Sequence, residues 1–68
     1  MRYAIVIETA NGNYSAYVPD LPGCIATGAT VADVENEFRE AIRFHIDDLK
    51  EDGQSVPQAT SIADYVEA

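Results

Sequence analysis

The sequence is poor in cysteine and histidine, which limits how a chain of its size can be stabilised. Its single cysteine, Cys24, cannot form a disulfide within one molecule, and no Cys/His spacing supports a zinc site. A chain of 68 residues hides only about 60% of the surface that its unfolded form exposes. We therefore expect a homodimer or a higher homo-oligomer, or a bound partner, to add stability. A lone cysteine is also typical of the reducing cytoplasm, where we expect the protein to lie.

Basic residues and long apolar runs are scarce as well. Four lysines and arginines stand against twelve acidic residues, which gives a formal net charge of −8. The electrostatic field of a protein with this negative charge repels polyanions and attracts basic proteins. Direct nucleic acid binding is therefore not expected. An acidic composition that serves only to keep the protein soluble is an equally favoured alternative to binding a basic protein. No run of about 18 apolar residues and no charged-then-apolar leader is present, so we expect neither membrane insertion nor export.

The N-terminal third of the chain has the pattern of a β-hairpin. Residues 2–8 are rich in Ile, Val and Tyr, and Asn11-Gly12 is a strong two-residue turn signal. This turn predicts that Ile7 faces Ala16 on the core side and that Val6 faces Tyr17 on the other side. Pro19 and the Pro22-Gly23 pair then end the second strand and turn the chain, after which residues 24–28 can form a short third strand.

A long amphipathic helix is predicted over residues 31–52. Thr30 is a good N-cap, and Gly53 is placed to be the C′ residue. One side of the helical wheel carries the core-facing set Val31, Val34, Phe38, Ala41, Ile42, His45 and Leu49. The opposite side carries the acids Asp33, Glu37, Glu40, Asp47 and Glu51, with Arg43 beside them and Phe44 near the edge. Residues 62–66 are predicted to add a fourth strand.

These elements predict an α+β fold of β-β-β-α-β order, with an antiparallel sheet and one long helix on one face. Residues 1–68 are expected to form a single domain. Because one helix covers only one face of such a sheet, the other face and at least one sheet edge are left for another chain. The pattern therefore favours a binding module.

Catalytic readings of individual residues are weaker than structural ones. His45 lies on the apolar helix side and is interpreted as a core histidine that a backbone carbonyl or a tyrosine hydroxyl satisfies, although a small hydrolase centred on it stays open. Cys24 has no basic neighbour that would lower its pKa, which favours a buried structural thiol. The acidic residues mostly lie along the exposed face of the helix, where water solvates them, so neither a metal nor another cofactor is expected.

One stretch resembles a known family. The corner Tyr17-Val18-Pro19-Asp20-Leu21-Pro22-Gly23-Cys24, followed by Gly28, Thr30 and the helix, is similar to the HicB family of antitoxins. The resemblance covers about residues 3–57, and the chain looks like a short form without a C-terminal DNA-binding segment. It implies a degenerate, partial RNase H-like fold that lacks nuclease activity.

The resemblance also implies a function and a partner. HicB-type proteins bind a small basic HicA-type toxin, which cleaves messenger RNA with a histidine, and block its active surface. We therefore expect a non-enzymatic inhibitor of such a toxin; the alternative is a solitary homo-oligomeric scaffold or regulatory module without a toxin. Candidate partner contacts are Tyr17, Asp20 and Leu21 from the corner, and Glu37, Glu40 and Phe44 from the helix.

Overall fold

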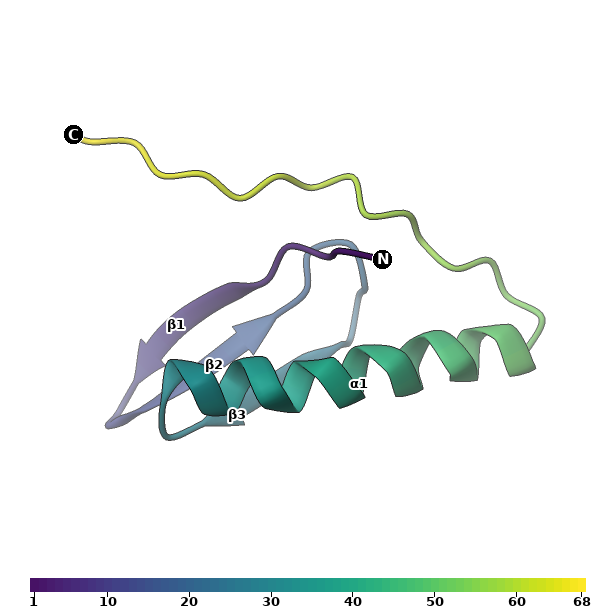
Figure 1. Cartoon of the computed structure of the whole chain (residues 1–68), viewed down its shortest axis with the longest axis horizontal. Helices are drawn as coiled ribbons and strands as arrows, with labels where there is room; N and C mark the ends of the chain where they lie inside the picture. The colour runs from purple at the N-terminus through teal and green to yellow at the C-terminus, as the bar shows by residue number, and fades with distance from the viewer.

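A computed structural model describes residues 1–68 as a three-stranded antiparallel sheet followed by one long helix (Figure 1). The elements are β1 (Val6–Ala10), β2 (Asn13–Tyr17), β3 (Ile25–Gly28) and α1 (Val31–Glu51). The strands lie in the sheet in the order β1-β2-β3, so β1 and β3 are its edges. The predicted α+β class and the β-β-β-α order are confirmed.

The turn between β1 and β2 sets the register of the sheet. Asn11 has a φ of 43° and Gly12 a φ of 87°, the positive values that a type I′ turn requires at both central positions. The resulting pairs include Val6 with Tyr17 and Ile7 with Ala16, as the sequence predicts. Because side chains alternate along a strand, this register places Ala16 on the core side and Tyr17 on the other side.

Both ends of α1 are capped by the residues that the sequence indicates. The Asp33 backbone N–H donates to Thr30 Oγ1 at 3.0 Å, so Thr30 is the N-cap. At the other end Gly53, with a φ of 70°, donates its N–H to the carbonyl oxygen of Lys50. The N–H of Gln54 reaches back to Leu49 at 2.8 Å, which completes a Schellman motif.

Removing the N-cap hydroxyl provides a first test of this helix. Thr30→Ala is expected to lower the free energy of unfolding by about 1 kcal/mol, because the Asp33 N–H loses its acceptor. Thr30→Ser keeps the oxygen and should retain most of the stability. Urea unfolding followed by circular dichroism measures both variants. An equal loss in both would assign the effect to the threonine methyl group and not to the cap.

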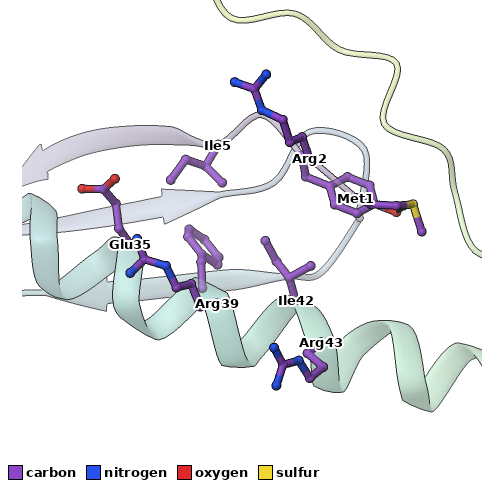
Figure 2. A pocket seen from close by; sticks show the side chains of 9 residues that line it. Met1, Arg2, Ile5, Glu35, Arg39, Ile42 and Arg43 are labelled. Atoms are coloured by element: carbon purple, nitrogen blue, oxygen red, sulfur yellow. Dashed lines mark hydrogen bonds between the residues drawn. The ribbon is translucent and has the colours of Figure 1, made fainter.

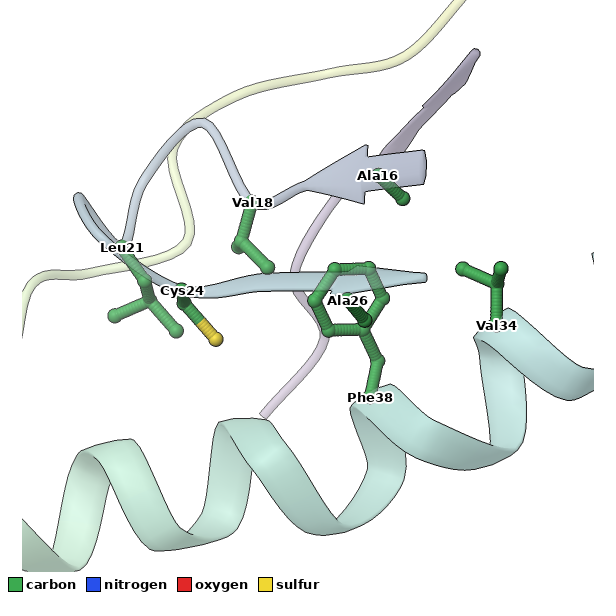
Figure 3. Close-up of a cluster of buried hydrophobic side chains, with 7 residues drawn as sticks. All are labelled: Ala16, Val18, Leu21, Cys24, Ala26, Val34 and Phe38. Atoms are coloured by element: carbon green, nitrogen blue, oxygen red, sulfur yellow. The ribbon is translucent and has the colours of Figure 1, made fainter. Parts of the chain in front are cut away.

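The core lies between β2, β3, the corner and the first half of α1. Seven buried apolar side chains form it (Figure 3): Ala16, Val18, Leu21, Cys24, Ala26, Val34 and Phe38. The helix packs mainly on β3 and less on β2. Its 21 residues extend about 31 Å, whereas strands of five residues extend only about 17 Å. The second half of α1 therefore overhangs the sheet, and His45 and Leu49 are only half-buried.

The predicted fourth strand over residues 62–66 is absent. The C-terminal segment, residues 54–68, is extended and belongs to no strand, and Ile62, Tyr65 and Val66 are 91%, 96% and 91% exposed. Side-chain hydrogen bonds hold its first part: Tyr3 Oη donates to the carbonyl oxygen of Pro57 at 2.6 Å, and Asp20 binds Thr60 and Ser61. No backbone hydrogen bond joins the segment to β1. The apolar side chains of Ile62, Tyr65 and Val66 therefore do not by themselves bring residues 62–66 into the sheet.

Candidate partner-binding surfaces

An apolar row crosses the sheet on the side opposite α1. The register joins Val6 of β1 to Tyr17 of β2, and Tyr17 to Ile25 of β3. Tyr17 and Ile25 are exposed, Ile25 to 71%, because their neighbours Ala16 and Ala26 face the helix. We call Val6, Tyr17 and Ile25 the open-face row. The sequence predicts its first two members; Ile25 was missed because no turn signal fixes the register between β2 and β3.

The Pro-Asp-Leu-Pro-Gly-Cys corner is a compact chain reversal. Leu21 N–H donates to the Val18 carbonyl at 3.1 Å, and Cys24 N–H donates to the Leu21 carbonyl at 3.1 Å. Gly23 has a φ of 84°, which glycine adopts more readily than other residues, and this allows the chain to follow the reversal. The reversal directs Leu21 into the core, where it is 0% exposed. Leu21 therefore offers no side-chain surface to a partner, and its expected role as a contact is replaced by a role in packing.

Asp20, on the outside of the same corner, already has partners within the chain. Its carboxylate accepts the backbone N–H groups of Thr60 and Ser61 at 3.0 and 2.9 Å, and both hydroxyl groups at 3.3 and 2.8 Å. The bonds from Ser61, followed by those from Thr60, hold the pKa of Asp20 below its usual value. Asp20 thus anchors the C-terminal segment, a role that no local signal in the sequence indicates.

The three helical candidates share one exposed strip. Glu37, Glu40 and Phe44 are three and four residues apart and therefore neighbours on the helix surface. All three are exposed, and Phe44 is 68% exposed. We call this strip, with Asp33, Asp47 and Glu51, the acidic helix face. It points away from the sheet, whereas Tyr17 lies on the open face. The sequence candidates therefore divide between two separate surfaces.

The basic side chains gather at a third place, which the sequence reasoning missed. A groove of about 690 Å³ separates the N-terminal residues from α1, and Arg2, Arg39 and Arg43 line it over the apolar side chains of Ile5 and Ile42 (Figure 2). A neighbouring groove of about 340 Å³ adds Lys50 to Arg39 and Arg43. All four basic residues of the chain thus border these grooves. The spacing of positions 39, 43 and 50 on one flank of the helix was the signal for this arrangement.

Two further residues singled out in the sequence are Cys24 and His45. Cys24 is buried, and burial raises the pKa of its thiol, which agrees with the structural role expected for it. His45 is half-buried, and neither of the hydrogen bonds expected for it is formed. No three His, Cys, Asp or Glu side chains converge on a point where a metal ion could bind. No helix is long and apolar enough to cross a bilayer.

The burial of Cys24 predicts that its thiol reacts slowly with reagents in solution. At pH 8 the folded protein should react with Ellman's reagent many-fold more slowly than the urea-unfolded chain, because the thiol is covered and its ionised form is disfavoured. The raised pKa also makes the stability of the fold depend on pH. The stabilisation is complete below the pKa of the unfolded thiol, and it is lost as pH rises through the higher pKa of the folded state. Equal rates in the folded and unfolded states would show that the corner opens freely.

Comparison with known proteins agrees with the features of the corner and the helix. The family model described as HicB-like antitoxin of bacterial toxin-antitoxin system matches residues 3–68. An uncharacterized 14.9 kDa protein in the rep-hol intergenic region of Haemophilus phage HP1 is 39% identical over 97% of this chain, which spans 50% of that relative. UPF0150 proteins of Thermoplasma acidophilum and Archaeoglobus fulgidus are each 36% identical over 85% and 82% of this chain, and each match covers 86% of the relative.

Proposed function

Because the chain belongs to the HicB-like antitoxin family of bacterial toxin-antitoxin systems, we propose that it binds and masks a small basic toxin of the HicA type. In this proposal the chain has no enzymatic activity of its own and acts in the cytoplasm by covering the surface with which the toxin holds messenger RNA. It contacts neither nucleic acid nor membrane directly.

The observation that carries this proposal is the acidic helix face. Glu37 and Glu40 flank an exposed Phe44, and the basic side chains of α1 lie on the other flank, beside the grooves. Glu37 has no basic residue three or four positions away along the helix, so no neighbour offsets its charge, whereas Asp47 shares the smaller groove with Arg43 and Lys50. A toxin that binds RNA must carry a complementary positive surface. An aromatic side chain rimmed by charges is a common centre of binding energy in such an interface.

The primary experiment is coexpression with a small basic toxin of the HicA type. Copurification and suppression of RNA cleavage by the complex are the expected results. Failure to form a complex, together with a clean homo-oligomer, would favour the alternative function, a scaffold that assembles without a toxin. The open-face row of Val6, Tyr17 and Ile25 is the feature that favours this alternative, because it is apolar and because Tyr17 and Ile25 are exposed.

Charge reversal tests whether the acidic helix face is the toxin-binding surface. Glu37→Lys combined with Glu40→Lys is expected to weaken toxin binding by at least about tenfold, largely through slower association, and to flatten its salt dependence. Surface plasmon resonance at several salt concentrations measures both effects.

The matched control keeps the change in net charge but moves it elsewhere. Glu8→Lys combined with Glu67→Lys alters two other exposed acids and should leave most of the affinity intact. Equal losses in the two double variants would mean that only net charge matters. Unchanged affinity in the helical variant would remove the acidic helix face from the binding site.

A further inference from the structure

The four basic side chains of this acidic protein border one continuous surface. The grooves of about 690 and 340 Å³ share five lining residues, among them Arg39 and Arg43 of α1, and therefore join along the helix (Figure 2). One wall is α1, from Glu35 to Lys50, and the other wall is formed by N-terminal residues within the stretch 1–5. We call these two spaces the basic grooves.

The positive charges of the basic grooves are hardly used within the chain. The only hydrogen bond from a basic side chain runs from Arg39 to the side-chain oxygen of Asn36. Arg2, Arg43 and Lys50 donate none, and all four basic side chains are exposed. A guanidinium group presents five donors in a planar fork that matches a carboxylate or a phosphate, so Arg39 too keeps donors free. The basic grooves can therefore bind an anion with two oxygens at each arginine.

The floor beneath these charges is apolar. The half-buried side chains of Tyr3, Ile5 and Ile42 form it, and Ile46 extends it within the smaller groove. A ligand that suits both the floor and the rim must combine apolar and acidic groups. The basic grooves are open along their length, whereas sites for small molecules usually enclose most of the ligand. This shape favours a segment of a larger molecule as the occupant.

The spacing of the charges favours a peptide over a nucleic acid. Arg39 and Arg43 are about 6 Å apart along the helix axis, and alternate residues of an extended chain are about 6.6 Å apart. The wall from Glu35 to Lys50 extends about 22 Å, which is room for roughly six or seven extended residues. A nucleic acid strand carries a charge at every nucleotide and would bring phosphates to Glu35 and Asp47, which line the basic grooves on either side of the two arginines. A peptide can place its acids opposite the arginines alone.

We propose that the basic grooves bind an extended acidic segment of a second protein, whose carboxylates at alternate positions pair with Arg39 and Arg43. Successive side chains of an extended chain point to opposite faces, so apolar residues between the acids face the apolar floor. Glu37 and Glu40, on which the proposed toxin binding depends, line neither groove. The binding of an acidic segment therefore does not rest on the binding of a basic toxin.

A short synthetic peptide tests this proposal. The probe is a fluorescein-labelled hexapeptide in which aspartates alternate with leucines, and the control peptide has asparagine at each aspartate. Fluorescence anisotropy should show saturable binding of the acidic probe that is at least about tenfold tighter than that of the control and that weakens as salt is added. Absence of saturable binding, or equal binding of the two peptides, would overturn the proposal.

Variants of the two arginines locate the site. Arg39→Gln combined with Arg43→Gln should weaken binding of the acidic probe at least about tenfold and should leave the circular dichroism spectrum unchanged, because both side chains are exposed. Gln54→Glu combined with Gln58→Glu shifts the net charge by the same amount at exposed positions outside the basic grooves and should keep most of the affinity. Equal losses in the two double variants would mean that net charge alone attracts or repels the probe, which would refute the site.

A nucleic acid is the competing occupant, and the same measurement separates it from a peptide. A labelled uridine oligonucleotide with the same number of charges as the peptide should bind more weakly than the acidic probe to the wild-type chain. Tighter binding of the oligonucleotide, lost in the variant with both Arg39→Gln and Arg43→Gln, would assign the basic grooves to nucleic acid and overturn the proposal.

Discussion

Replacing Phe38 with alanine is expected to unfold a large fraction of the protein at room temperature. Phe38 is 2% exposed and packs in the core with Val34 from the helix and Ala26 from β3. Truncating a buried phenylalanine costs about 3–5 kcal/mol. A chain of 68 residues has a total stability of only about 3–10 kcal/mol at 0.05–0.15 kcal/mol per residue. The loss is therefore comparable to the whole stability, and far-UV circular dichroism with urea titration measures it.

The same helix provides the matched control for this substitution. Phe44→Ala removes the same atoms from a side chain that is 68% exposed, six residues further along α1. Its effect on the free energy of unfolding should lie within about 0.5 kcal/mol. Comparable losses at positions 38 and 44 would mean that Phe44 is covered in solution, for instance by a second copy. If only Phe38 matters for folding, Phe44→Ala becomes a clean variant with which to measure toxin binding.

The parts of the fold that could be predicted are those whose signal is local. Asn11-Gly12 fixes the first hairpin because few residue pairs adopt positive φ at both positions, and the observed register follows from it. Thr30 and Gly53 bound the helix for similarly local reasons. The buried positions Val34 and Phe38 follow from the helical period. Each of these inferences needs only residues that are close in the sequence.

The parts that could not be predicted depend on contacts between distant residues. Asp20 and Ser61 are 41 positions apart, and no local pattern indicates that a turn carboxylate binds the C-terminal segment. Leu21 was expected to be an exposed contact of the corner, but the chain reversal carries it into the core. The fourth strand over residues 62–66 was predicted from a short apolar run that Asp64 interrupts. Such a run is compatible with a strand but does not show whether a neighbouring sheet edge is available to it.

The distribution of charge along α1 connects these findings. The acidic helix face and the basic flank lie on either side of the buried stripe, so one helix presents two surfaces of opposite sign. The basic flank faces the N-terminal residues and the side of the molecule where the C-terminal segment passes. Of the acidic helix face, Asp47 borders the smaller groove, and the other acids lie outside both grooves. A basic toxin bound at Glu37 and Glu40 would therefore leave the basic grooves free.

Substituting Asp20 should release the start of the C-terminal segment while the sheet and helix stay folded. Asp20→Ala removes the acceptor for the backbone N–H groups of both Thr60 and Ser61. The NMR order parameters at positions 60 and 61 are expected to fall from about 0.85 to below about 0.6. Asp64→Asn is the matched control, because Asp64 lies in the same segment and its carboxylate accepts only from the N–H of the next residue, Tyr65. Loss of order at positions 60 and 61 in the control as well would show that the whole segment is mobile for another reason.

Acid should reproduce the effect of this substitution in the wild-type chain. The bonds from Ser61 and Thr60 lower the pKa of Asp20, so the folded state holds this carboxylate ionised more strongly than the unfolded chain does. The anchor is thus fully present above the ordinary carboxyl pKa of about 3.9 and is lost as pH falls through the lower folded value. The amide signals of Thr60 and Ser61 should follow that titration in the wild type and should not follow it in Asp20→Ala.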